Sequence, residues 1–171
     1  MKELLSPNCT KRTDGTKIKK IVLMASLMQD AEAQAKELQN PKRQRSFHYI
    51  IGCDGEVIQG VPEDCRAWSA HLRSVDEESI SVLFCTKGIP DCVVTDETFD
   101  SLSKLISDIC ERYSITPFIA GRNEGSIILY FVGAYMQKHT QALVYDVNDL
   151  NAEKKIKKAK KTRKPKGGTE K

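Results

Sequence analysis

Residues 46–61 read SFHYIIGCDGEVIQGV, and residues 79–84 read SISVLF. In the first stretch, two extended runs at 47–51 and 57–61 flank a turn at 53–56 that contains an Asp-Gly pair. Glycine takes a positive φ without steric cost, so an Asp-Gly pair between runs rich in Ile, Val, Phe and Tyr is a strong hairpin signal. These residues predict a β-hairpin, and the apolar run that follows predicts another strand in the interior of the same sheet.

The segments around the hairpin predict a strand and two helices. Residues 18–24 have lysines at 19 and 20 and then an apolar run, which is typical of a strand buried on both faces. Apolar residues spaced i, i+4 and i+7 over residues 31–38 predict a short helix. Thr95 is a good N-cap for an amphipathic helix over residues 99–113. The basic residues 42–45 are interpreted as a solvated connection rather than a binding patch.

Three further segments complete the predicted α/β fold. Residues 73–78 predict a polar loop, and residues 115–120 predict a short edge strand, because Pro117 cannot donate a hydrogen bond to a central ladder. Residues 126–136 are apolar and aromatic, which fits either a strand that turns into a helix or a buried helix. The whole pattern predicts a mixed central β-sheet flanked by helices.

Length and composition indicate one folded domain between two flanking segments. The 171 residues have a mean hydropathy of −0.43, and no run approaches the roughly 18 to 20 apolar residues that a membrane span needs. Turn-forming residues predict a flexible leader over 1–16, followed by a domain over 17–150 and a tail over 151–171. The leader has no apolar segment long enough for a secretory signal, so we expect the protein in the cytoplasm.

The tail carries the positive charge of the chain. From Glu153 onward there are ten Lys or Arg against two Glu, whereas the preceding residues carry 17 Lys or Arg against 21 Asp or Glu. A segment with so high a charge density is predicted to be disordered. Lys154–Lys166 could contact a polyanion without sequence specificity, by releasing counterions, or it could simply be solvated.

The cysteines are predicted to be reduced thiols. Six of them occur, and none belongs to a Cys-x-x-Cys pair. Cys53 and Cys65 flank the second strand of the hairpin, but a disulfide between them needs an oxidising compartment, which nothing in the sequence indicates.

Several of these motifs, in this order, resemble the peptidoglycan amidase domain of N-acetylmuramoyl-L-alanine amidases, which short phage amidases and peptidoglycan recognition proteins share. The resemblance covers roughly residues 18–124. It rests on the hairpin that begins at Ser46, the Arg-Ala-Trp motif at 66–68, the Ser-Ile pair at 79–80 and the helix exit at 111–115. It implies the fold predicted above. In active members it also implies zinc-dependent hydrolysis of the amide between muramic acid and the stem peptide, with two histidines and an aspartate or cysteine as zinc ligands.

At the positions that the resemblance assigns to catalysis, this sequence departs from the family pattern. Met24 stands in place of the first histidine ligand, and Gly121 stands in place of the second. Leu83 aligns with the glutamate that some members use as a general base, and no segment like the third-ligand loop follows Asn123. A thioether, a methyl group or a hydrogen does not replace imidazole as a zinc ligand. The sequence therefore predicts a phage or bacterial pseudoenzyme that keeps the fold and holds no zinc.

Five residues remain as candidates for lining the former active-site groove. His48 and Tyr49 are adjacent on a strand and point to opposite faces; the resemblance places the pair near the groove floor, and His48 could instead be packed in the interior. His71 could lie near His48 and rebuild a site with a cysteine. Trp68 is either a packing aromatic or a platform for a sugar ring or stem peptide. Arg122 is the fifth candidate for lining the groove.

Three functions are compatible with these observations. The first is a non-catalytic module that binds peptidoglycan fragments or a protein partner through the groove. The second is an active amidase with an unconventional site, and the third is an accessory protein that binds polyanions through the lysine-rich tail. Metal content and turnover separate the second from the first, and removal of residues 153–171 separates the third from both.

Overall fold

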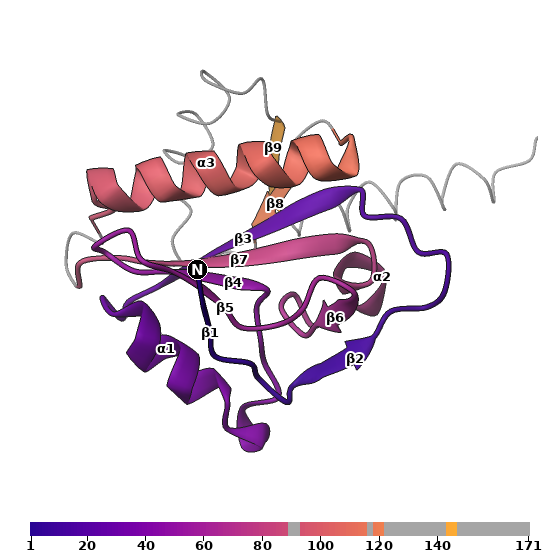
Figure 1. The fold of residues 1–171 in the computed structure, drawn as a ribbon, viewed down its shortest axis with the longest axis horizontal. Helices are drawn as coiled ribbons and strands as arrows, with labels where there is room; N and C mark the ends of the chain where they lie inside the picture. Colours follow the sequence, from indigo (N-terminus) through magenta and orange to yellow (C-terminus); the bar gives the residue numbers. More distant parts are fainter. Residues whose placement is uncertain (89–92, 116–117, 122–142, 147–171) are drawn as a thin grey trace, which may run out of the picture.

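The structure of the chain is a computed structural model that describes residues 1–88, 93–115, 118–121 and 143–146, the last two ranges by their backbone. These residues form two sheets and the helices that pack on them (Figure 1). The larger, seven-stranded sheet has the spatial order β1 (Lys2–Glu3), β5 (Val57–Gln59), β4 (Tyr49–Ile51), β7 (Ser79–Cys85), β3 (Lys20–Ser26), β8 (Phe118–Gly121), β9 (Leu143–Asp146). The smaller sheet pairs β2 (Cys9–Lys11) with β6 (Cys65–Ala67), and the helices are α1 (Ala31–Leu38), η1 (Pro41–Arg43), α2 (Arg73–Asp76) and α3 (Asp96–Tyr113).

The larger sheet is mixed, as the sequence predicts. β4 and β5 form the predicted antiparallel hairpin, with Ile50 opposite Ile58, whereas β4, β7, β3, β8 and β9 form a parallel series. At the hairpin turn Gly55 has φ +80°, and a Cβ atom there would lie 2.9 Å from the carbonyl oxygen of Glu97. Glycine therefore lets the turn pack closely on the first turn of α3.

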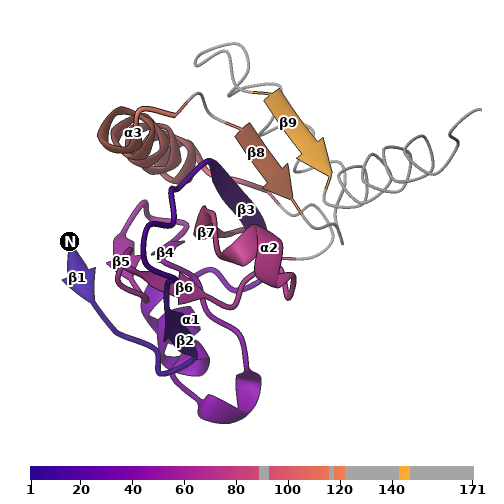
Figure 2. The same ribbon diagram turned by 90° about the vertical axis from the view of Figure 1, so that its right-hand side faces the viewer.

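Helices cover both faces of this sheet (Figure 1). Alternate residues of a strand point to opposite faces. Accordingly, Leu23 of β3 packs in a buried cluster with Ile106 of α3, and the next residue, Met24, packs in a second cluster with Ala35 of α1. The strand is buried on both faces, as predicted. β2 and β6 lie on the same side of the sheet as α1, away from α3 (Figure 2).

The N-terminal segment differs from the predicted flexible leader. β1 runs parallel to β5, with Lys2 opposite Ile58, and β2 runs antiparallel to β6, with Thr10 opposite Arg66. Both partners lie more than 50 residues further along the chain. Turn propensity is a local property, so it could not indicate pairings over this distance.

Two other predicted elements need correction. Residues 73–78 were predicted as a loop, but Arg73–Asp76 form α2, whose N-terminal residues follow a tight turn at His71. The predicted edge strand over 115–120 is β8, and it lies between β3 and β9 in the sheet because it begins at Phe118, after the proline. The predictions for residues 126–136 and for the tail over 151–171 lie outside the described residues. None of the described helices is both long enough and apolar enough to span a membrane.

Candidate functional site

The carboxyl ends of adjacent parallel strands bring together the three positions that the sequence assigned to lost catalytic groups. Met24 of β3 is in register with Leu83 of β7, and its neighbour Leu23 is in register with Gly121 at the end of β8. Crevices beside the carboxyl ends of parallel strands are common places for ligand sites. Met24 and Leu83 are 3% and 4% exposed, so the floor of this region is apolar.

A pocket of about 520 Å³ opens next to these strand ends. It is bounded by the end of β3, the loop that follows it, the C-terminal half of α1, the segment around η1 and His71. Its lining residues are Ser26, Leu27, Met28, Gln34, Glu37, Leu38, Arg43, Arg45 and His71. A volume of this order holds a ligand of small-molecule size, and the lining mixes apolar side chains with hydrogen-bonding and charged ones.

Arg45 lines the pocket and also reaches Met24 of β3. Its Nη2 atom lies 3.0 Å from the sulfur of Met24, and its Cζ atom lies 5.3 Å from the centre of the Phe47 ring. The other arginine of the pocket, Arg43, forms an ion pair with Glu37 of α1. The sequence analysis interpreted residues 42–45 as a solvated connection, and this interpretation is wrong for Arg45, which is half-buried.

The N-terminal segment fixes the wall of the pocket that carries these arginines. Asn8 is 2% exposed, and its Nδ2 donates to the carbonyl oxygens of Leu38, Asn40 and Arg45 at 3.0, 2.9 and 3.3 Å. Ser6 Oγ also donates to the Leu38 carbonyl, at 2.6 Å. Sequence reasoning missed this contribution, because no local signal links residue 8 to residues 38–45.

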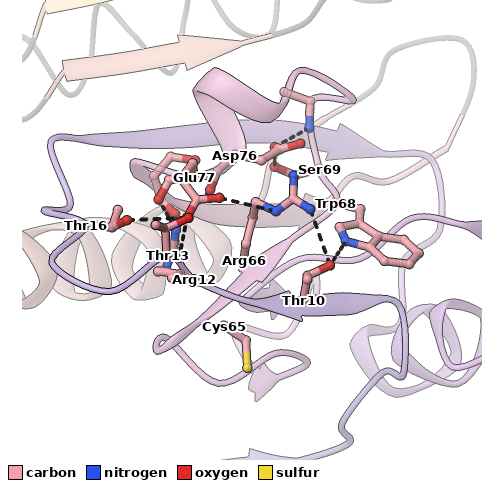
Figure 3. A network of polar contacts seen from close by, with 12 residues as sticks. Thr10, Arg12, Thr13, Thr16, Cys65, Arg66, Trp68, Ser69, Asp76 and Glu77 are labelled. Carbon is pink, nitrogen blue, oxygen red and sulfur yellow. Dashed lines mark hydrogen bonds and ion pairs between the residues drawn. The ribbon is translucent and has the colours of Figure 1, made fainter.

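Of the predicted groove residues, His71 lies at the pocket. It is exposed, and its φ of +53° is in the left-handed region, where residues other than glycine are strained. Trp68 is not among the lining residues. Its Nε1 donates to Thr10 Oγ1 at 2.9 Å, so the indole contacts the β2–β6 sheet (Figure 3). Arg122 lies outside the described residues.

His48 is buried away from the pocket, among hydrogen-bonding groups of the chain itself. Its Nδ1 accepts from the backbone N–H of Ser81 at 2.9 Å, which places the proton on Nε2, and Nε2 lies 3.0 Å from the Cys65 carbonyl oxygen. Burial, and then the nearby charge of Arg12, lower the pKa of His48 to about 3. The ring is therefore neutral at physiological pH, and these contacts favour the packed interpretation of His48.

Arg12 links the chain segments around His48 by hydrogen bonds. It donates to the carbonyl oxygens of Glu63, Asp76 and Ser79 at 2.9, 3.0 and 2.7 Å, and its Nη2 also lies 2.9 Å from His48 Nε2. Burial lowers the pKa of Arg12 from its usual value. The residue thus joins the segment after β2 to the loop before β6, to α2 and to β7.

Tyr49 points to the opposite face of the sheet from His48, as period-2 alternation predicts. Its hydroxyl donates to Glu63 at 2.7 Å, and the hydroxyl of Tyr113 donates to the same carboxylate at 2.8 Å. Arg112 of α3 pairs with Glu63 through both terminal nitrogens. Burial, followed by the hydrogen bond to Glu63, raises the pKa of Tyr49. These contacts fasten α3 to the loop after β5, away from the pocket.

Ser69, two residues before His71, is hydrogen-bonded within the turn that precedes α2. Ser69 is 1% exposed, and its Oγ donates to Asp76 Oδ1 at 2.8 Å (Figure 3). The same carboxylate oxygen accepts from the backbone N–H of Ala70 at 2.8 Å. Asp76 therefore fixes the turn that leads to α2. No group of three or more His, Cys, Asp or Glu side chains within the described residues is arranged to hold a metal ion.

Comparisons with known proteins identify the family and the fold. The family model described as N-acetylmuramoyl-L-alanine amidase matches residues 14–142. In structure the chain is similar to the Drosophila peptidoglycan recognition protein PGRP-SA, with a TM-score of 0.61 and 12% identity over 84% of this chain and 94% of that chain. It is similar to a mutant endolysin from Bacillus subtilis, with a TM-score of 0.54 and 22% identity over 68% of this chain and 81% of that chain. For PlyL the TM-score is 0.56, with 20% identity over 67% of this chain and 75% of that chain. Among curated proteins, none matches the sequence.

Proposed function

The chain belongs to the N-acetylmuramoyl-L-alanine amidase family, and from this premise we propose that it is a pseudoenzyme that binds peptidoglycan fragments, or a peptide segment of a protein partner, in the pocket beside Met24. Members of the family either cleave peptidoglycan or bind it. The proposal assigns this chain to the second group.

The chemical character of the strand ends supports a non-catalytic role. An amidase zinc ion needs imidazole, carboxylate or thiolate ligands and one position for a water molecule. The described residues at this place offer the thioether of Met24, the hydrocarbon side chain of Leu83 and the guanidinium of Arg45. These groups do not fit a zinc ion, because two of them are poor or absent ligands and the third is a cation. We therefore derive no catalytic step through the metal.

The single observation that supports binding is the pocket itself. Its volume is about 520 Å³, it lies beside Met24, where the resemblance puts a zinc ligand, and its lining includes hydrogen-bonding groups from Ser26, Gln34 and His71. Peptidoglycan fragments present amides, hydroxyls and carboxylates, which such groups can pair with. A peptide segment of a partner protein presents amides and carboxylates as well, which is why both ligands belong to the proposal.

Calorimetric titration with soluble peptidoglycan fragments tests the proposal. Leu27→Trp places a large ring at the pocket mouth, and we expect it to weaken binding by tenfold or more. Val93→Trp is the matched control, because Leu27 and Val93 are both exposed apolar residues, 54% and 49%, and Val93 does not line the pocket. Absence of binding to any fragment, or equal binding by both variants, would contradict the proposal.

Active hydrolysis remains the alternative that family membership favours. It predicts release of stem peptides from purified cell wall, stimulation by zinc and inhibition by a chelator. Our proposal predicts no release under the same conditions. A third function, polyanion binding through Lys154–Lys166, is favoured by the charge of the tail; it predicts binding that survives Leu27→Trp and disappears when residues 153–171 are removed.

A further inference from the structure

Two half-buried free cysteines come together on the smaller sheet, Cys9 of β2 and Cys65 of β6. We propose that this pair is a redox-sensitive modification site, at which a low-molecular-weight disulfide such as glutathione disulfide produces a Cys9–Cys65 bond. The bond fastens the N-terminal segment to the rest of the domain. The inference is independent of the proposed function, because none of its steps requires a ligand in the pocket.

The strand register places the two thiols on one face of the smaller sheet. β2 and β6 are antiparallel, with Cys9 opposite Ala67 and Lys11 opposite Cys65. Directly opposed residues share a face, and so do residues two apart on one strand, which makes Cys9 and Cys65 diagonal neighbours on the same face. The side chain of Arg66, between them in register, belongs to the other face, and Cys65 points away from it (Figure 3).

The geometry of the ladder brings this diagonal pair into contact. The backbone N–H of Arg12 donates to the Asp64 carbonyl oxygen at 3.3 Å, so by alternation Cys9 and Ala67 are a pair without mutual hydrogen bonds, in which side chains lie closer. The strong twist of a two-stranded ribbon draws one diagonal pair together. The thiols of Cys9 and Cys65 accordingly form a hydrogen bond with each other. A disulfide requires only that these neighbouring sulfurs move to bonding distance, about 2.05 Å.

The bond would act on the segment that supports the pocket wall. Asn8, the residue before Cys9, donates to the carbonyl oxygens of Leu38 and Arg45 at 3.0 and 3.3 Å. The Cys9 thiol donates to the Ser6 carbonyl oxygen at 3.7 Å, and Ser6 Oγ donates to Leu38. Strands held by hydrogen bonds at the margin of a domain open locally without global unfolding. A covalent bond to β6 prevents this opening, so oxidation would keep the wall in place.

The reaction exchanges one disulfide for another. Burial and the charge of Asp64 raise the pKa of Cys65, which makes its thiolate scarce at neutral pH, so we assign the first attack to Cys9. Cys9 forms a mixed disulfide with one half of the oxidant and releases the other half as a thiol. Cys65 then attacks the Cys9 sulfur and releases the second half. The two cysteine sulfurs lose one electron each, the two oxidant sulfurs gain them, and the two thiol protons end on the released thiols.

A second pair of neighbouring cysteines provides an internal control. Cys53 packs against the buried cluster that contains Cys85. Cys85 is 0% exposed, and burial raises its pKa to about 12. Its thiol is therefore neither ionised at neutral pH nor accessible to an oxidant. We expect Cys85 to stay reduced under conditions that join Cys9 to Cys65.

Incubation of the whole folded chain in glutathione buffers of increasing oxidised fraction tests the inference. After alkylation of the remaining thiols and proteolysis, mass spectrometry should find the Cys9 and Cys65 peptides joined, and dithiothreitol should separate them again. Cys85 should not be part of any bridge. Failure of Cys9 and Cys65 to oxidise, a lasting glutathione adduct on either of them, or bridges to other cysteines would overturn the inference.

Three variants assign the steps to the two thiols. Cys65→Ser should keep one glutathione on Cys9, because the thiol that displaces it is missing. Cys9→Ser should take up glutathione at least tenfold more slowly. Cys110→Ser is the matched control, since it removes another half-buried thiol, on α3, and should form the bridge as the unchanged chain does. Equal behaviour of the three variants would contradict the assignment.

The physical effect of the bond is measured on the unchanged chain, so the test does not depend on the folding of any variant. The bond closes a loop of on the order of 50 residues, and the midpoint of thermal unfolding should rise by about 5 to 10 °C on oxidation. Hydrogen exchange at the amides of residues 2–11 should slow by tenfold or more. Unchanged exchange in fully bridged protein would refute the fastening of the N-terminal segment.

Discussion

Two polar regions lie on the same face of the main sheet, and they are built in opposite ways. Ser81 and Leu83 are two residues apart on β7 and therefore point to the same side. Around Ser81, His48 and Arg12 are enclosed and hydrogen-bonded to the chain itself. Beside Leu83, the polar side chains surround an open pocket. The two regions contain similar residue types, so residue type alone does not distinguish structural groups from ligand-binding ones.

The two regions differ in the partners of their polar side chains. In the closed region backbone carbonyls and N–H groups saturate the arginine and the histidine, and a ligand could bind there only by breaking the fold. Beside the pocket, Arg45 contacts a thioether and a ring, and the side chains that line the pocket border open space. A histidine or arginine therefore indicates a ligand-binding site only where an open pocket lies beside its side chain.

The largest expected effect comes from opening the closed region. Arg12→Ala removes hydrogen bonds to four part-buried backbone carbonyls, those of Glu63, Asp76, Glu77 and Ser79, and we expect a loss of about 3 kcal/mol in the free energy of unfolding. Arg66→Ala is the control, because Arg66 makes one ion pair, at 3.5 Å, with Glu77, and should cost about 1 kcal/mol or less. Urea denaturation measures both, and equal losses would contradict the comparison.

A smaller effect is expected where the N-terminal segment supports the pocket. Asn8→Ala leaves the carbonyls of Leu38, Asn40 and Arg45 without their donor, and we expect a loss of about 2 kcal/mol. Asn40→Ala, which removes only an exposed cap on Lys42, should cost about 0.5 to 1 kcal/mol. Because Asn8 holds the Arg45 backbone, fragment binding should also weaken in Asn8→Ala and not in Asn40→Ala.

The enclosure of His48 predicts a dependence of stability on pH. Its pKa is lowered to about 3 in the folded state and is about 6.5 when unfolded, so between these values the unfolded chain binds the extra proton and stability falls as pH decreases. From pH 6 to pH 5, wild type should lose about 1 kcal/mol more than His48→Gln, which does not titrate. Parallel urea titrations at the two pH values measure this difference. Identical losses would show that the histidine is not enclosed as described.

The smallest effect concerns the strained rim of the pocket. His71 has φ +53°, which glycine adopts freely, so His71→Gly should raise the free energy of unfolding by about 0.5 kcal/mol. Arg73→Gly, two residues later in α2, should lower it by about 1 kcal/mol. A loss of stability in His71→Gly comparable to that in Arg73→Gly would mean that the turn is not strained.

The elements with local signals could be predicted from the sequence. The Asp-Gly turn, the apolar run of β3, and the Thr95 cap, whose side chain accepts from the backbone N–H of Thr98, all depend on neighbouring residues, and the structure confirms each. β1 and β2 could not be predicted, since their short segments are strands only because of partners that lie far along the chain.

Only part of the candidate site could be predicted, because some of its contacts join residues that lie far apart in the sequence. The resemblance identified Met24, Leu83 and Gly121, and the parallel register shows that these positions are neighbours. Arg45 was missed because charge in a short basic run normally indicates solvent exposure. Its packing depends on Met24, which lies 21 residues earlier. Trp68 and His48 were predicted as groove residues because their residue types are rare in this chain. In the structure, Trp68 contacts the smaller sheet and His48 lies in the closed region.

The pairing of β2 with β6 has a consequence for synthesis. Residues 9–11 leave the ribosome long before residues 65–67, so β2 has no partner in the growing chain until the residues of β6 have been made. Contacts between distant segments form slowly, because the loop between them must first close. Asn8 is anchored beside this pairing, so the pocket wall should become ordered only after residues 65–67 have been made, although residues 38–45 are made earlier.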